Sequence, residues 1–513
     1  MVYLTKKERI LFTNREAEIE ELNKGIELLK NGFPKNFSLI GLRKIGKTLL
    51  TKKFGENLEN TVIPFFFNIE KNFSLPEDFA LRFAYTIFYS LKPGGNYIPN
   101  LSELNRIKPK SKIADDMVNL FLSEYEKRKP NKLLLIQKAF ELPDRLAKEL
   151  NIKFVVFLDE FQAIIGLNNY KEIKNILGAI RVFFEHTENV MWVISGSAIS
   201  LMLNITSDPK SSFFELFTNV NLDFFSKENT LKHINKIERM YNAKISSVIK
   251  EKIFVFTRGH PFYVFCITDK LCSISKEPLL RELTAAIFEE VLTPGARIYG
   301  HCKYVFDTSL EKAKGKATIK RVLEFLSING LSTMTDIAKS TKMTLQTVNI
   351  SLIRLKEVDI VERIRQQYRI CDPVLMFWIK NTILGGEDFI KIKEARMKQI
   401  EQELLNAKTE LGKAKEYEIK DKLEKQFGLK LDNYLKDKIE LDLVGKKNDI
   451  YYIFEIKWRN KPTDYKDIKN FLNKIKKSEF KDKNKKLFFI SKSGFTKQAT
   501  DILKKNEIEI IEM

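Results

Sequence analysis

The sequence contains few of the residues that build zinc sites and disulfide frameworks. Among its 513 residues are four histidines and four cysteines, and the cysteines form no C-x-x-C pair: they are Cys266, Cys272, Cys302 and Cys371. Because structural zinc sites and disulfide scaffolds need closely spaced ligands, neither class is expected. The N-terminus lacks an apolar signal core, and no run reaches the roughly eighteen apolar residues of a membrane span. The sequence therefore indicates a cytoplasmic protein with no membrane partner.

Acidic residues are also in the minority: the sequence has 67 of them and 88 lysines and arginines, which gives a formal net charge of +21. This excess favours polyanionic partners, with nucleic acid ahead of an anionic membrane, but a lysine-rich solvated surface explains it equally well. At this length we expect roughly two to four domains. The apolar fraction of 44% is sufficient to give each of them a core.

Glycine is scarce as well, yet two glycines frame a short segment that fits the pattern G-x-x-x-x-G-K-[ST]. The segment comprises Gly41, Leu42, Arg43, Lys44, Ile45, Gly46, Lys47 and Thr48. It follows the apolar run NFSLI, which predicts a strand, and precedes TKKFGENL, which predicts a helix. In that setting the backbone N–H groups and the helix N-terminus bind phosphates, the lysine reaches the β and γ oxygens, and the threonine binds Mg²⁺. The alternative is a tight turn that binds nothing.

A second apolar run, KFVVFLDEFQ (153–162), ends in two acids. At the carboxyl end of a parallel strand, Asp159 would hold Mg²⁺ and Glu160 would orient or deprotonate the attacking water; capping of the next helix is the alternative. The runs at 60–70 and 189–198 complete four strands of a mainly parallel sheet with helices on both faces. Ser195 and Ser197 end the last strand, where a polar group could contact the γ-phosphate or merely form a turn.

The middle of the chain reads as helices, with short amphipathic ones over 226–310. From residue 317, three helices and the alternating segment VERIRQQYRICDP predict a winged helix-turn-helix. Its third helix would enter the DNA major groove; alternatively, the module is only a packing element. The candidate DNA contacts are Gln346, Asn349, Arg354, Arg363 and Arg365. A charged helix over 381–415 then connects to the last hundred residues, and a homo-oligomer through this helix is the alternative to a plain connector.

A second cluster of acids is predicted near the C-terminus. Strands at 441–444 and 451–456, joined by the turn GKKND, form a hairpin that carries Asp442, Glu455 and Lys457. Two carboxylates and an amine can bind Mg²⁺ and activate water for phosphodiester hydrolysis. Solvated hairpin residues are the plainer interpretation. Seven lysines between 474 and 486 could contact phosphates or belong to a solvated loop.

Five motifs in order resemble the archaeal ATPases of the STAND branch of AAA+ proteins: NREAEIEEL, GLRKIGKT, FLDEFQ, VISGSA and TRGHPFY. The resemblance covers roughly residues 10–380 and implies ATP and Mg²⁺ as ligands. It assigns Lys47 and Thr48 to the phosphate loop, Asp159 and Glu160 to the second acidic motif, and Pro261 to a lid element that touches the nucleotide. These ATPases usually carry an arginine where this chain has 207–222 without one, which implies slow hydrolysis unless Arg181 or Arg258 substitutes.

The C-terminal pattern resembles the PD-(D/E)xK nucleases, which implies Asp442, Glu455 and Lys457 as catalytic residues together with Glu418 on the preceding helix. The expected fold class is therefore α/β: a P-loop NTPase core (1–225) with a helical lid (226–310), a winged helix (311–380), a connecting helix (381–415) and a nuclease-like domain (416–513). The expected function is a nucleotide switch that controls DNA binding or cleavage. An ATP-dependent scaffold or regulator that binds DNA or protein without nuclease activity is the alternative.

Overall fold

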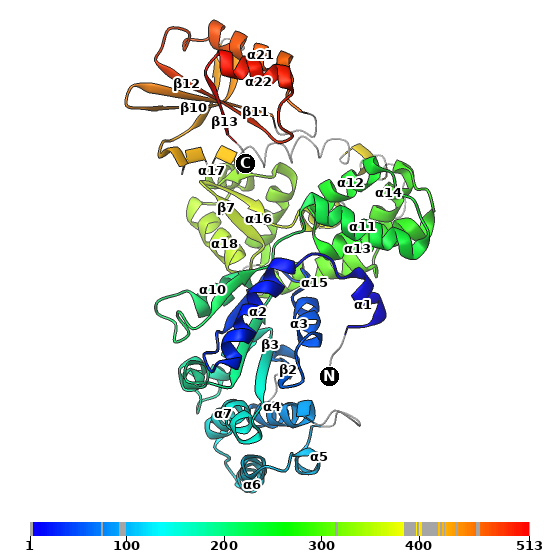
Figure 1. Cartoon of the computed structure of the whole chain (residues 1–513), viewed down its shortest axis with the longest axis vertical. Coiled ribbons are helices and arrows are strands. Elements are labelled where there is room, and N and C mark those ends of the chain that lie inside the picture. Colours follow the sequence, from blue (N-terminus) through cyan, green and yellow to red (C-terminus); the bar gives the residue numbers. More distant parts are fainter. Residues whose placement is uncertain are drawn as a thin grey trace. The chain divides into compact units, whose positions relative to one another are not determined.

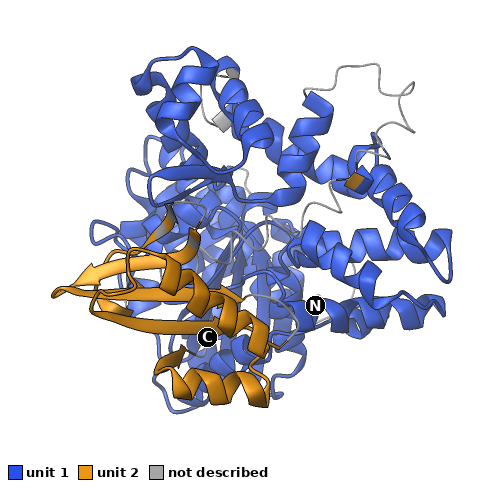
Figure 2. Ribbon diagram, turned by 90° about the horizontal axis from the view of Figure 1, so that it is seen from above, with its two compact units in different colours: residues 1–401 blue, residues 402–513 orange. Residues whose placement is uncertain are grey.

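The computed structural model folds into two compact units, residues 1–401 and 402–513, and each has its own core (Figure 2). Within them the structure describes residues 4–72, 75–91, 99–312, 316–383, 397, 400–402, 419–420, 423–424, 426–436, 439–457 and 462–511. Within these ranges no helix is both long enough and apolar enough to cross a bilayer. Most of the predicted connecting helix (381–415) lies outside the described residues, and so does Glu418.

A five-stranded parallel sheet forms the centre of the first unit, with the strand order β2-β3-β4-β1-β5. Its strands are β1 (Phe37–Ile40), β2 (Val62–Asn68), β3 (Lys153–Asp159), β4 (Val190–Gly196) and β5 (Thr218–Asn221). The predicted α/β fold with a parallel sheet is thus confirmed, although the prediction of four strands was one short. The edge strand β5 reads TNVN and has no buried residue, so it gives no apolar run from which a strand could be predicted.

Helices cover both faces of this sheet, and the alternation along β3 shows why. Phe154, Val156 and Leu158 join one buried cluster, whereas Val155 and Phe157 join the other. Successive side chains of a strand point to opposite faces, so a run that is apolar throughout needs cover on both. The helices of this core are α1 (Lys6–Leu11), α2 (Glu16–Lys30), α3 (Lys47–Glu56), α4 (Pro76–Leu91), α5 (Leu101–Ile107), α6 (Lys112–Tyr125), α7 (Lys132–Leu150), α8 (Ile176–Ile180), α9 (Val182–Glu185) and α10 (Ile199–Thr206).

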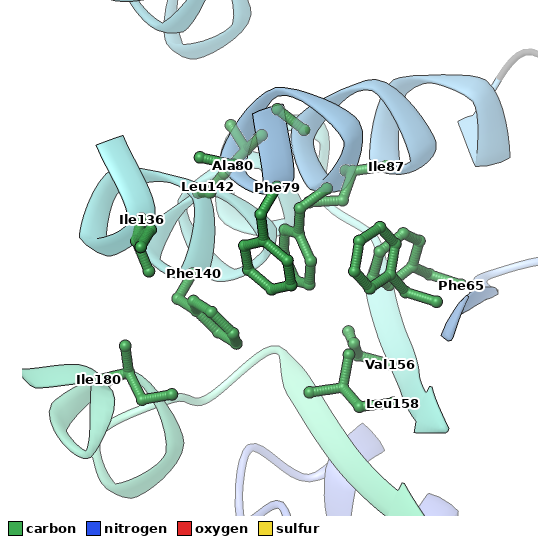
Figure 3. Packing of buried hydrophobic residues seen from close by; sticks show 14 of the residues in the cluster. Phe65, Phe79, Ala80, Ile87, Ile136, Phe140, Leu142, Val156, Leu158 and Ile180 are labelled. Atoms are coloured by element: carbon green, nitrogen blue, oxygen red, sulfur yellow. The ribbon is translucent and has the colours of Figure 1, made fainter. Parts of the chain in front are cut away.

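Aromatic rings fill the space between the sheet and helices α4 and α7. Figure 3 shows Phe79 of α4 and Phe140 of α7 directed toward Val156 and Leu158 of β3. The rings of Phe83 and Phe140 have centroids 4.8 Å apart, and those of Phe184 and Trp192 are 4.4 Å apart. This packing fixes the strands from one side and leaves their carboxyl ends to carry polar residues.

Helices follow the core in the first unit (Figure 1). They are α11 (Lys227–Tyr241), α12 (Ser247–Thr257), α13 (Pro261–Ile274), α14 (Leu280–Ile287) and α15 (Arg297–Lys312). Left-handed residues end two of them: Asn242 closes α11, and Arg258, followed by the left-handed Gly259, closes α12. Asparagine and glycine suit this conformation, which stops a helix and turns the chain toward the next one.

A smaller module, residues 316–370, combines three helices with a three-stranded antiparallel sheet. Its helices are α16 (Lys316–Asn329), α17 (Met334–Thr341) and α18 (Leu345–Glu357); its strands are β6 (Ser332–Thr333), β7 (Val361–Ile364) and β8 (Gln367–Ile370), in the order β6-β8-β7. The side chains of Thr333 and Thr344 accept backbone N–H groups at the starts of α17 and α18. Helix α19 (Pro373–Trp378) follows β8, and the side chain of Asp372 caps it.

The second unit is a mixed five-stranded sheet in the order β13-β12-β11-β10-β9. Strands β9 (Asp432–Lys436), β10 (Ile439–Lys447) and β11 (Ile450–Lys457) are antiparallel; β12 (Lys485–Ser491) and β13 (Ile508–Ile511) run parallel to β11; the helices are α21 (Tyr465–Lys477) and α22 (Lys497–Lys505).

Two details of this unit differ from the sequence-based expectations. The hairpin turn is shorter than GKKND, because Gly445, Lys446 and Lys447 belong to β10 and only Asn448 and Asp449 turn. Both have positive φ, 51° and 61°, which matches the two-residue turns that suit twisted strands. The other difference concerns the lysines at 474, 476 and 477, which were considered for a loop but lie on α21.

Candidate functional site

Asp159, the last residue of β3, receives hydrogen bonds from three neighbouring segments at the carboxyl edge of the sheet. Its Oδ2 accepts from the Thr48 hydroxyl at 3.1 Å and from Asn68 Nδ2 at 3.2 Å, while its Oδ1 accepts from Ser195 Oγ at 2.7 Å. These donors come from the start of α3, the end of β2 and the end of β4. These donors fix the orientation of the carboxylate beside Thr48. An oxygen pair of this kind is the ligand type that Mg²⁺ prefers.

Lys47 lies buried at the start of α3 and is folded onto its own loop. Its ammonium donates to the carbonyl oxygen of Gly41 at 2.6 Å and to that of Leu42 at 3.0 Å. Burial lowers the pKa of Lys47 to about 8, although the carboxylates of Glu160 and Asp159 oppose the shift. The loop bends through Lys44 and Gly46, whose φ angles are 61° and 109°. A buried cation and a helix N-terminus therefore meet in one turn, an arrangement that suits binding of an anion.

Glu160 stands beside Asp159 but has a separate set of partners. Its Oε2 accepts from Gln162 Nε2 at 2.6 Å, from Ser197 Oγ at 2.8 Å and from the Ser197 N–H at 3.2 Å. Burial alone would raise the pKa of Glu160, but these hydrogen bonds and the attraction of Lys47 hold it below its ordinary value. The carboxylate is therefore ionised at neutral pH and able to accept a proton when its donors release it.

The turn before α13 and the neighbouring helices pack onto the same loop. The Arg43 guanidinium lies 4.4 Å from the ring centroid of Tyr304 on α15, and the Lys44 ammonium lies 3.8 Å from that of Phe262 on α13. Pro261, which was expected near the nucleotide, is the first residue of α13 and directly precedes Phe262. The loop is thus in contact with the helices that follow the core.

Three residues of this region were not singled out from the sequence: Asn68, Gln162 and Arg15. Asn68 could have been found, since it ends the apolar run VIPFFFN just as Asp159 ends β3. Arg15 has φ 83° and donates to the Asp223 carbonyl at 2.7 Å, a long-range contact without a local pattern.

The two proposed substitutes for the missing arginine are engaged elsewhere. Arg181 pairs with Glu185 at 2.9 Å, and Arg258 is buried near Glu362, Arg369 and Asp372.

The second unit brings together the acids and the lysine expected there and adds a second lysine. Asp442 of β10 and Glu455 of β11 adjoin the paired residues Leu443 and Phe454, and Asp442 Oδ2 accepts from the Ile456 N–H at 2.6 Å. Glu455 Oε1 lies 2.7 Å from Lys457 Nζ and 2.9 Å from Lys474 Nζ of α21. Burial and the charge of Glu455 raise the pKa of Asp442 to about 6. In the part of the chain that the structure describes, no three Asp, Glu, His or Cys residues gather as a metal-binding group.

The parallel sheet, the phosphate-type loop and the acidic strand end together resemble the fold of P-loop NTPases. Residues 12–266 match the model of a family described as an ATPase domain predominantly from Archaea. Among curated proteins, none matches the sequence.

Several solved structures match this chain. A Walker-type ATPase of Pyrococcus abyssi, PABY2304, is 16% identical, with 72% of this chain and 96% of that chain covered and a TM-score of 0.52. The ORC2 protein of Aeropyrum pernix in ADPNP–ADP complexes is 14% identical, with 75% and 98% covered and a TM-score of 0.47. The RuvB Holliday junction branch migration motor of Thermotoga maritima is 13% identical, with 70% and 92% covered and a TM-score of 0.34.

Proposed function

We propose that the first unit binds ATP with Mg²⁺ in the loop of residues 41–48 and hydrolyses it slowly. The observation that carries the proposal is the hydrogen bond from Thr48 to Asp159, which joins the start of α3 to the end of β3 at 3.1 Å. A hydroxyl and a carboxylate held together beside a buried lysine fit a magnesium ion and the phosphates it accompanies. Mg²⁺ bound there would supply charge neutralisation for the phosphate oxygens.

Each residue of the site then has a distinct task. The N–H groups around Gly46 and the Lys47 ammonium bind phosphate oxygens once Lys47 leaves the carbonyls of its own loop. Glu160 orients the attacking water and accepts its proton, because it is ionised and adjacent to Asp159. The segment 207–222 contains no arginine to stabilise the transferring phosphoryl group, which supports slow turnover.

The test compares ATP binding and ATP hydrolysis by four proteins: wild type, Lys47→Ala, Glu160→Gln and the control Lys53→Ala. The control removes a lysine six residues further along α3, outside the contacts of Asp159. We expect Lys47→Ala to lose binding, Glu160→Gln to bind but not hydrolyse, and Lys53→Ala to behave as wild type. Unchanged turnover in Glu160→Gln would refute its role as the base.

For the second unit we propose a metal-dependent nuclease-like site formed by Asp442, Glu455 and Lys457, with Glu418 outside the described residues. A buried acid, Glu455, a half-buried acid, Asp442, on the neighbouring strand, and an ammonium 2.7 Å from Glu455 support it. Cleavage of supercoiled DNA with Mg²⁺ or Mn²⁺ should be lost in Asp442→Asn and retained in Asp449→Asn, which alters an exposed carboxylate of the same hairpin. Intact DNA with every protein would leave the unit as a binding domain.

We further propose that residues 316–370 form a winged helix and that ATP binding alters what it and the second unit contact. Its α18 carries Gln346, Asn349 and Arg354, the candidate base contacts, but it also exposes Leu345 (50% exposed), Ile350 (42%) and Ile353 (49%). Three exposed apolar side chains favour a protein partner for this helix, whereas DNA would favour cations. Equal DNA binding and equal DNA cleavage with and without ATP would refute the proposal that ATP controls these contacts.

A further inference from the structure

Helix α10 receives its cap from a distant part of the chain. The residue before it, Ala198, provides no capping side chain. Instead the Ser200 N–H donates to Asp359 Oδ1 at 3.0 Å and Oδ2 at 3.2 Å, and the Ser200 hydroxyl donates to Oδ1 at 2.7 Å. The first N–H groups of a helix have no partner within it, and an acidic side chain there also complements the helix dipole. The 316–370 module thus holds the start of a core helix.

The backbone conformation of Asp359 would favour glycine, which indicates that the aspartate side chain has a role of its own. Asp359 follows α18 with φ 59°, a conformation that favours glycine after a helix. Its N–H donates to the Lys356 carbonyl at 3.1 Å, and the next N–H, of Ile360, donates to the Leu355 carbonyl at 3.0 Å. Glycine would form both of these bonds with less strain. The aspartate adds only its carboxylate, and that carboxylate is directed to Ser200.

The capped helix lies next to the proposed base. Ser200 comes three positions after Ser197, and Ser197 donates both its N–H and its hydroxyl to Glu160 Oε2. Helix α10 also packs directly on the end of β4: a Cβ atom at Gly196 would lie 2.5 Å from Met202 Cγ and 2.4 Å from Gln162 Oε1. With so little space, a shift of α10 must move Ser197 or Gln162, which are the donors to Glu160.

Three donors on one carboxylate oxygen make it a weaker base, because they stabilise the ionised form that must accept the proton. We propose that Asp359 is a positioning residue that restrains ATP hydrolysis: docked on Ser200, it fixes α10 and keeps Ser197 on Glu160. A partner that draws the 316–370 module away from α10 would release Glu160 and raise the rate. This inference rests on the proposed ATP hydrolysis and on the role assigned there to Glu160.

The decisive variant is Asp359→Gly, because glycine suits the left-handed backbone and removes only the carboxylate. We expect its kcat for ATP to rise roughly fivefold, the rate equivalent of about one net hydrogen bond, with KM unchanged. Asp359→Asn, which keeps one acceptor oxygen, should lie between the glycine variant and wild type. The matched control is Asp336→Asn, a capping aspartate of α17 in the same module; its kcat should equal that of wild type.

Two further measurements separate positioning from a merely structural effect. Ser197→Ala should also raise kcat, and adding Asp359→Gly to it should raise kcat no further, because both act on the same restraint. Amide hydrogen exchange over residues 199–206 should be faster in Asp359→Gly. An unchanged or lower kcat, additive effects of the two substitutions, or unchanged exchange would each overturn the proposal.

The same panel distinguishes failure of this inference from failure of the proposed function. If Lys47→Ala and Glu160→Gln turn over ATP like wild type, the assignment of the site is wrong and the inference is lost with it. If Glu160→Gln abolishes hydrolysis while Asp359→Gly leaves kcat unchanged, the site stands and only the restraint by Asp359 is wrong.

Discussion

Gly259 lies in the turn between α12 and α13, and we predict that alanine there is far more harmful than at a matched glycine. Its φ is 80°, and a Cβ atom would lie 2.2 Å from the carbonyl oxygen of Phe225 and 3.0 Å from Thr230 Oγ1. Gly295 has φ 87° with nothing within 4 Å of the corresponding Cβ position. Gly295→Ala therefore carries the backbone cost alone, whereas Gly259→Ala adds a steric clash.

The size of the difference follows from these contacts. A left-handed backbone costs alanine about 1–2 kcal/mol, and both variants incur it. In Gly259→Ala the gap to the Phe225 oxygen must also open from 2.2 Å to at least 3.0 Å, although the Phe225 N–H donates to the Gly259 carbonyl at 2.9 Å. Losing that hydrogen bond costs about 1 kcal/mol, and overpacking adds about 1–3 kcal/mol. We expect Gly259→Ala to lose about 3–6 kcal/mol in all.

The assay is denaturant-induced unfolding of both variants, with titration of a fluorescent ATP analogue as a second readout. Since α13 begins two residues after Gly259 and carries Phe262 against Lys44, we expect weaker nucleotide binding in Gly259→Ala than in Gly295→Ala. Equal destabilisation of the two variants would show that the Phe225 carbonyl can move away from the added Cβ atom with no loss of stability, and the steric argument would be refuted.

Two other predictions concern buried charges. Burial lowers the pKa of His233 in the folded protein to about 4. As the pH falls below about 6.5, the histidine of the unfolded chain takes up a proton before that of the folded chain, so the free energy of unfolding decreases. At pH 5 this histidine should lower the free energy of unfolding by about 2 kcal/mol relative to pH 7.5. His233→Gln should lose that part of the acid sensitivity in thermal unfolding at the two pH values, and an identical pH response would contradict the assignment. Lys474→Met removes one of two ammonium groups from Glu455, which is 2% exposed, and should destabilise the second unit by roughly 1.5–3 kcal/mol. Limited proteolysis should detect this loss and find none in Lys476→Met, whose side chain is exposed; equal susceptibility of the two variants would contradict it.

Features encoded in contiguous residues were predictable from the sequence. The loop of residues 41–48 combines a fixed spacing with a preceding apolar run, and the strand before Asp159 is apolar throughout, so local pattern alone identified both. Strand β5 was missed because an edge strand with no buried residue has no such pattern. The hairpin turn was placed too early because lysines and a glycine resemble loop residues, whereas the left-handed pair Asn448 and Asp449 sets the turn.

Contacts between distant residues could not be predicted in this way, because they depend on how whole elements pack. Asn68 and Asp159 are 91 positions apart, and Ser200 and Asp359 are 159 apart. An aspartate after α18 reads locally as an ordinary polar stop to a helix. Only the folded chain shows that its carboxylate caps α10, a distant helix of the same unit.

The core is joined to the helices and the module that follow it at two chemically different points. At the loop, Lys44 lies on Phe262, and the adjacent Tyr263 donates to Asp372, just beyond β8, at 2.5 Å. At the far side of the site, Asp359 holds α10 next to the donors of Glu160. The first connection involves the phosphate loop and should bias binding of nucleotide; the second involves the proposed base and should bias hydrolysis. Changes at Phe262 should therefore act mainly on KM and changes at Asp359 on kcat, so a partner of the module could alter turnover without displacing the nucleotide.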